Sequence, residues 1–212
     1  MSRAGRPRVH VHLSREAIAQ AGLALIDRDG PEALSLRNLA VELGVGTTTL
    51  YGHVRSRDEI VTDIVGLLLG EVDTAARPKE PWDDVLRRVA HSLRDIVLRH
   101  PGAFTLIALA PVDDSPVLDY AHAIEVLSCA GGMSEEQFIE SWQVVDPFLT
   151  GFLLMETAAL ERGRQTAREG SGSPSTSGAF RQGMAKAHSD EAFAAALEII
   201  IAGLRDKQAR DT

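Results

Sequence analysis

The chain has 212 residues, 44% of them hydrophobic but only 5% aromatic, and a formal net charge of −8 at pH 7. This length allows one or two domains with a sizeable core. Because aromatic residues are scarce, that core must be built mainly from Leu, Ile, Val and Ala. This composition favours helices. No apolar run approaches the roughly 18–20 residues of a membrane span, no secretory signal is expected at the N-terminus, and the single Cys129 excludes an internal disulfide. We therefore expect a cytoplasmic protein that does not bind membranes.

The charge is unevenly distributed along the chain. Residues 1–57 contain eight arginines and five acidic residues, so this segment carries +3 and the remainder carries −11. A basic end on an acidic body indicates two functions. The basic end can bind a polyanion such as DNA, while the body serves a separate purpose.

Three helical segments are predicted close to the N-terminus. The periodicity of apolar residues predicts a first helix over 14–29, with Ser14 as its N-cap. A second helix over 35–43 ends at Gly44, a residue suited to a turn with positive φ, and a third covers about 47–53. This spacing is typical of a helix-turn-helix, in which the second helix of the motif enters the major groove of DNA.

Polar residues and glycines around the third helix are the candidate DNA contacts. Threonine hydroxyls can exchange hydrogen bonds with base edges, and threonine methyl groups can touch thymine. Tyrosine, histidine and arginine side chains can donate to phosphates, and Arg37 can also pair with guanine. The predicted DNA-binding residues are Arg37, Gly46, Thr47, Thr48, Thr49, Tyr51, Gly52, His53 and Arg57, together with Arg6 from the N-terminal arm. The arm, residues 1–13, either enters a narrow minor groove through its Gly-Arg-Pro motif or is a disordered basic tail.

The rest of the chain also predicts helices. A Ser-x-x-Glu capping box opens a helix over about 56–76. Further on, the low-complexity segment 163–178 predicts a mobile loop. The other expected helices are 82–99, 104–109, 115–130, 134–162 (kinked at Pro147) and 189–207. The predicted fold class is all-α, with a three-helix helix-turn-helix domain over 14–60 and a helical regulatory and dimerisation domain over 61–212.

The stretch TTTLYGHVRSRDEI is the most specific motif of the chain. With the residues before it, this stretch resembles the N-terminal domain of the tetracycline-repressor (TetR) family of transcriptional regulators, which typically carries Leu-Tyr-x-His, then Val or Phe, then a basic residue. The segments PWDDVLRRVAHSLRDIVLRHPGA and SDEAFAAALEIIIAGL are similar to the tetracycline repressor class itself. The resemblance implies a homodimer formed by the helices at 134–162 and 189–207. On the last helix the apolar residues either face the partner subunit or pack within one chain; they are Ala194, Leu197, Ile200, Ile201 and Leu204.

The same resemblance implies a cavity for a small effector in the regulatory domain. The candidate effector-binding residues, each also typical of an ordinary core, are Leu93, Ile96, Phe104, Ile107, Trp142, Phe148, Phe152 and Met155. The positions that hold magnesium-bound tetracycline in the tetracycline repressor correspond here to Asp73, Leu106, Pro147 and Met155. Because these residues are a poor ligand set for a metal, the sequence predicts a largely apolar effector, no metal site and no cofactor.

We therefore predict a transcriptional repressor that binds a palindromic operator on double-stranded DNA as a homodimer. Two other functions are compatible with a DNA-binding head, namely an activator and a non-specific architectural DNA-binding protein. The acidic body argues against the architectural protein because it repels DNA. An enzyme is not expected, since Cys129 has no neighbouring His and the chain lacks a phosphate-binding loop and an HExxH motif.

Overall fold

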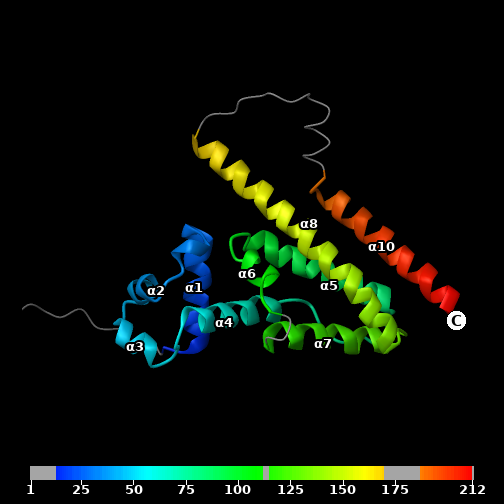
Figure 1. The fold of residues 1–212 in the computed structure, drawn as a ribbon, viewed down its shortest axis with the longest axis horizontal. Helices are drawn as coiled ribbons and strands as arrows, with labels where there is room; N and C mark the ends of the chain where they lie inside the picture. Colours follow the sequence, from blue (N-terminus) through cyan, green and yellow to red (C-terminus); the bar gives the residue numbers. More distant parts are fainter. Residues whose placement is uncertain (1–12, 112–114, 170–186, 212) are drawn as a thin grey trace, which may run out of the picture.

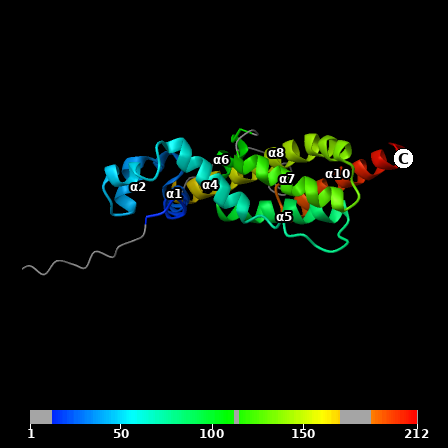
Figure 2. The same cartoon turned by 90° about the horizontal axis from the view of Figure 1, so that it is seen from below.

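The computed structural model describes residues 13–111, 115–169 and 187–211, and every regular element within these ranges is a helix. Helices α1 to α4 gather at one end of an elongated molecule, and the C-terminus lies at the other end (Figures 1 and 2). The predicted all-α class is confirmed. Within the described ranges, no helix is long and apolar enough to span a membrane.

The predicted helix-turn-helix is present, and its caps follow the sequence. Its elements are α1 (Arg15–Asp29), the 3-10 helix η1 (Pro31–Ala33), α2 (Leu36–Glu42) and α3 (Thr47–Tyr51). The hydroxyls of Ser14 and Ser35 accept hydrogen bonds from the backbone N–H three residues on, at 3.1 and 3.2 Å, and so cap α1 and α2. Gly44 has φ of 65°, and the next N–H, that of Val45, donates to the carbonyl of Ala40 at 3.0 Å. A residue with a side chain would be strained at this φ, which explains the glycine in the turn.

Helix α4 (Arg57–Gly70) begins at the predicted capping box. The Ser56 hydroxyl accepts from the N–H of Glu59 at 3.2 Å, while the Glu59 carboxylate accepts from the N–H of Arg55 at 2.7 Å. Two backbone donors at the helix start are thus satisfied by one pair of side chains.

The end predicted for α4, near residue 76, is wrong, because the helix stops at Gly70. The chain that follows is held against the next helix. The N–H of Asp73 donates to the Ser92 hydroxyl at 2.8 Å, and Arg88 pairs with the Asp73 carboxylate at 3.0 Å. These contacts redirect the backbone away from the axis of α4.

The C-terminal body is built from α5 (Trp82–Arg99), α6 (Phe104–Ala108), α7 (Ser115–Ala130), α8 (Glu135–Glu169) and α10 (Asp190–Asp211). The helices predicted over 82–99 and 115–130 have the predicted bounds. Helix α8 is longer than predicted, so residues 163–169 are helical where a loop was expected. The remaining part of that predicted loop, residues 170–178, lies outside the described residues.

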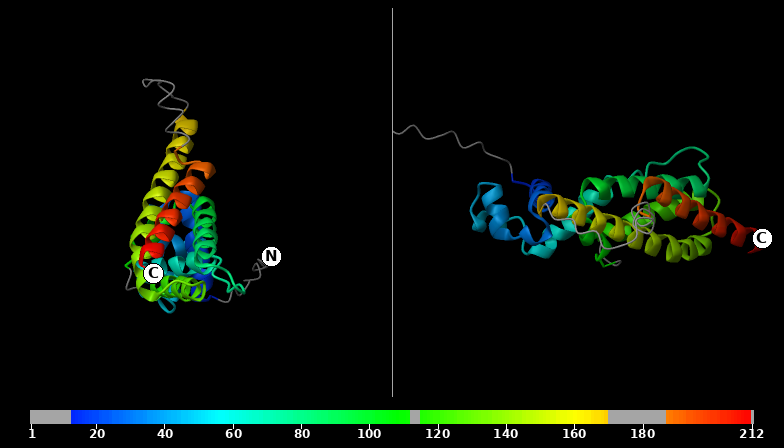
Figure 3. Two further views of the ribbon diagram at one scale, coloured as in Figure 1. Left: turned by 90° about the vertical axis from the view of Figure 1, so that its right-hand side faces the viewer. Right: turned by 90° about the horizontal axis from the view of Figure 1, so that it is seen from above.

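Helices α8 and α10 run side by side along the body (Figures 1 and 3). The buried ring of Phe193 on α10 lies 6.1 Å from the ring of Phe148 and 5.2 Å from that of Phe152, both on α8. The guanidinium of Arg94 on α5 lies 5.1 Å from the same Phe193 ring. Helix α10 is therefore anchored through its first turns to two neighbouring helices.

Candidate DNA-binding surface and effector cavity

Helix α3 presents a polar face to solvent at one end of the molecule. Threonines 47–49 in its first turn are exposed, and Tyr51 keeps 56% of its surface exposed. On the opposite face, Leu50 and the following Val54 are fully buried. Gly46 is the N-cap, with an extended backbone. The buried pair fixes the helix, and the predicted DNA contacts are left free on its outer face.

The arginines of the helix-turn-helix differ in how many partners they have. Arg15 and Arg28 are ion-paired with acidic neighbours at 2.9 and 3.0 Å. The side chains of Arg37 and Arg55 are exposed and have no ion pair within the part of the chain that the structure describes. Both cations are therefore available to a polyanion such as DNA.

Arg57 has an intramolecular role that the sequence did not predict. Its Nε donates to the backbone carbonyl of Leu34 at 3.0 Å, which ties α4 to the loop before α2. His53 and Gly52 are exposed, and a Cβ at Gly52 would lie 3.2 Å from a backbone carbonyl oxygen of α3. The remaining predicted contact, Arg6, lies outside the described residues.

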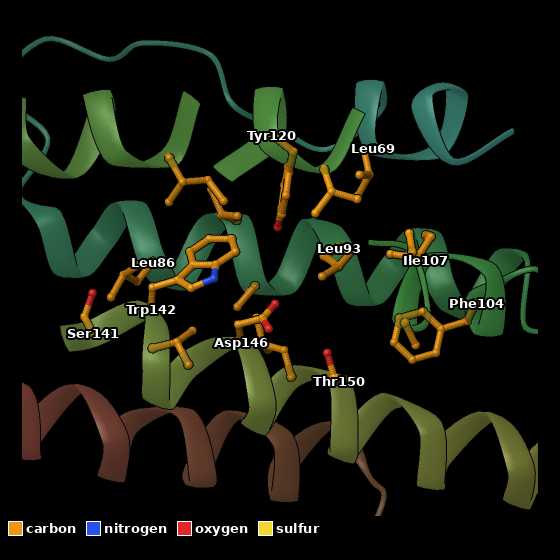
Figure 4. Close-up of a pocket in the computed structure, with 18 of the residues that line it drawn as sticks. Leu69, Leu86, Leu93, Phe104, Ile107, Tyr120, Ser141, Trp142, Asp146 and Thr150 are labelled. Atoms are coloured by element: carbon orange, nitrogen blue, oxygen red, sulfur yellow. The ribbon is translucent and has the colours of Figure 1, made fainter. Parts of the chain in front are cut away.

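A cavity of about 110 Å³ lies within the C-terminal body, among α4, α5, α6, α7 and α8 (Figure 4). Its lining is mostly apolar. The lining residues are Leu69, Leu86, Val89, Ala90, Leu93, Phe104, Ile107, Ala108, Ala110, Val117, Tyr120, Ile124, Phe138, Ser141, Trp142, Val145, Asp146, Leu149 and Thr150. Ligand sites commonly enclose roughly 300–1,000 Å³, so any ligand larger than a single small ring must displace some of these side chains.

Four of the eight predicted effector-binding residues line this cavity, namely Leu93, Phe104, Ile107 and Trp142. The other four are placed elsewhere. Ile96 is buried in the general core, Phe148 and Phe152 pack on α10, and Met155 is 50% exposed. The three residues of α8 miss the cavity because the helical period turns them towards α10 or solvent, whereas Trp142, Val145 and Leu149 point inward.

Sequence reasoning missed the polar groups of the cavity. Tyr120 from α7 and Asp146 and Thr150 from α8 lie among the apolar lining (Figure 4). Burial raises the pKa of Asp146, and burial together with the negative charge of Asp146 raises the pKa of Tyr120. A signal was available in the sequence, because Asp146 follows the inward Trp142 by four residues and so shares its helix face.

Helix α4 belongs to both the DNA-binding unit and the cavity. Towards its start it packs on α1, where a Cβ at Gly22 would lie 3.0 Å from Cδ1 of Ile64. Towards its end, Leu69 lines the cavity. The boundary predicted at residue 60 therefore falls inside a single continuous helix.

Two family models match the chain. Residues 18–64 match "Bacterial regulatory proteins, tetR family", and residues 74–208 match "Tetracyclin repressor-like, C-terminal domain". The two matches correspond to the helix-turn-helix with α4 and to the body that encloses the cavity. Together they support the resemblance found in the sequence.

Individual relatives support the same family. The tetracycline repressor protein class E of Escherichia coli is 32% identical over 69% of this chain and 70% of its own length. An HTH-type transcriptional regulator of Saccharopolyspora erythraea is 27% identical over 68% of this chain, but the match spans only 61% of that protein. The solved structure of apo ActR from Streptomyces coelicolor has a TM-score of 0.73 at 26% identity and covers 99% of this chain and 100% of ActR. ActR has also been solved in complex with (S)-DNPA.

Proposed function

The chain belongs to the TetR family of transcriptional regulators, and we propose that it is a repressor that binds a palindromic operator as a homodimer and is released by a small, largely apolar effector. The exposed polar face of α3, with the exposed Arg37 and Arg55 nearby, supplies the DNA-binding surface. The mostly apolar cavity of the body supplies the effector site.

The sharing of α4 between the two sites is the observation that carries this proposal. A ligand changes DNA affinity only if it binds the two arrangements of the protein with different affinity. A ligand that displaces Leu69 moves α4. Helices α1 and α4 lie so close together at Gly22 that α1 must move with α4. The position of α3 in the groove thereby depends on occupancy of the cavity.

Exposed apolar and small residues on α8 and α10 support the homodimer. On α8, Val144, Gly151 and Met155 share one exposed face, and on α10 Ile199 is 73% exposed. A Cβ at Gly151 would meet nothing within 4 Å in the protomer, so a second helix can approach closely there. Of the apolar residues named on α10 from the sequence, Leu197 and Ile201 are fully buried within their own chain, which is the second of the two alternatives given for that face.

Selection of bound fragments from random duplex DNA by the purified protein tests the proposal. A palindromic consensus, bound by a dimer and weakened as salt rises, is the expected result. Recovery of no consensus by a folded dimer would contradict it and would favour the architectural protein. Transcription from a promoter that carries the recovered site then separates repressor from activator, since added protein lowers transcription in the first case and raises it in the second.

A further inference from the structure

One side chain of the cavity carries a charge that its surroundings do not balance. Asp146 and Tyr120 are the titratable residues among those that line the cavity. The Asp146 carboxylate has no hydrogen bond or ion pair within the described ranges, and burial raises its pKa. Removing a carboxylate from water without a partner is costly. A ligand that offers a positive charge would offset this cost.

The wall of the cavity beside Asp146 is aromatic. The ring of Trp142 lies 6.3 Å from that of Tyr120, edge to face, and 5.8 Å from that of Phe138, with all three residues lining the cavity. Figure 4 shows Tyr120 and Asp146 reaching from α7 and α8 towards the interior of the cavity. Aromatic faces carry negative charge density and attract cations, most strongly when water is excluded.

We propose that the cavity recognises a small organic cation with an aromatic or apolar arm, in which the cationic centre pairs with Asp146 and lies against Tyr120 and Trp142. The inference rests on the proposed function only in taking this cavity as the effector site. It narrows the largely apolar effector to one that carries a single positive charge. The apolar arm occupies the remainder of the cavity, towards Leu93 and Phe104.

Other ligand classes fit this lining less well. An anion is repelled by Asp146, and a fully neutral hydrocarbon leaves the partly buried carboxylate without a partner. A metal ion needs several ligands, and within the described part of the chain no three His, Cys, Asp or Glu side chains come together. A compact organic cation offsets the charge and also uses the aromatic wall.

Binding of a matched pair of probes to the full-length protein without DNA tests the proposal. The pair is phenyltrimethylammonium and tert-butylbenzene, which have the same shape and differ by one charge. We expect the wild-type protein to bind the cation about tenfold or more tightly than the hydrocarbon, measured by titration calorimetry or ligand-detected NMR. In Asp146→Asn this preference should disappear. Glu136→Gln removes the same charge from an exposed position on α8 and should leave the preference unchanged.

The outcomes separate this inference from the proposed function. Equal binding of both probes by the wild-type protein, or a preference that survives in Asp146→Asn, overturns the cation inference and leaves operator binding untouched. A charge preference that depends on Asp146 supports the inference even if the cation fails to dissociate the operator complex. In that case binding at the cavity and release of the operator are separate properties, and release by an effector is contradicted if larger cations that bind the cavity also leave the operator complex intact. Circular dichroism of Asp146→Asn establishes that the variant is folded.

Discussion

A buried ion pair between α5 and α8 provides a quantitative test of how the body is held together. The Arg94 guanidinium donates to both carboxylate oxygens of Glu156, through Nε at 2.9 Å and Nη2 at 2.6 Å, and both residues are buried. The same Nη2 donates to Asp190 at 2.7 Å, but the Asp190 side chain is 84% exposed. One arginine thus has a buried and an exposed acidic partner. The hydrogen bonds that Arg94 donates to Glu156 raise the pKa of Arg94, which stays charged at any accessible pH.

Glu156→Gln should destabilise the protein far more than Asp190→Asn. Glu156→Gln leaves the buried Arg94 charge with only the exposed Asp190 as its acidic partner, and losing the buried partner of such a pair costs about 3–5 kcal/mol. An exposed pair is screened by water and contributes about 0–1 kcal/mol. For a chain of this size, each kcal/mol corresponds to roughly 2–4 °C in Tm. Glu156→Gln should therefore lower Tm by about 6–20 °C, and Asp190→Asn by a few degrees at most.

Urea unfolding followed by circular dichroism, together with calorimetric Tm values, measures both effects. All variants must be compared at one protein concentration, because the proposed dimerisation would make the apparent stability depend on concentration. The reasoning is refuted if the two substitutions destabilise the protein equally, or if Glu156→Gln stays within about 1 kcal/mol of the wild type. Either result would mean that Arg94 draws its compensation from Asp190 or from solvent instead of from Glu156.

Three further predictions concern DNA binding, assembly and pH. Arg37→Ala and Tyr51→Ala should each weaken operator binding about ten- to a hundredfold in a fluorescence-anisotropy titration, without changing the oligomeric state. The control variant Arg15→Ala removes an arginine that is already ion-paired, and it should bind the operator nearly normally. Ile199→Arg should yield monomers by analytical ultracentrifugation, because it places a charge on an exposed apolar face. Burial raises the pKa of Asp146, so its negative charge opposes folding at a pH above that raised pKa. Asp146→Asn should therefore raise stability against urea at pH 7.5. This gain should be lost as the pH falls through the raised pKa towards the ordinary pKa of an aspartate, because the wild-type carboxyl is then protonated as well.

The helix-turn-helix could be read from the sequence because local chemistry determines it. Capping serines, the positive φ of Gly44 and the period of apolar residues are all encoded within a few positions, and α1, α2 and α3 begin within one residue of where they were expected. The end of α4 was not predictable in this way. It depends on Ser92 and Arg88, which lie far along the chain and hold Asp73 against α5.

The cavity was harder to predict than the DNA-binding surface. Apolar residues of α8 have the same sequence signature whether they face a cavity, α10 or a partner subunit, so Trp142, Phe148 and Met155 could not be separated before the packing was known. The period of 3.6 residues fixes which side chains share a face, but it does not identify the neighbour of that face. Asp146 could have been singled out, because a carboxylate on an apolar face departs from the pattern of an ordinary core, but sequence reasoning missed it.

The size of the cavity bears on which bound ligands can change the affinity of the protein for DNA. At about 110 Å³ the cavity accepts a small ring without much change, but a larger ligand must push its walls apart. Leu69 is a wall residue on α4, and α4 is fastened to the DNA-binding unit by Arg15–Asp63 at 2.9 Å and by Arg57. A displaced α4 therefore carries α1 to α3 with it as one body. We therefore expect the affinity for a ligand to depend on the charge that meets Asp146, and release of the operator to depend on the volume that displaces Leu69, so that a ligand can satisfy the first requirement without the second.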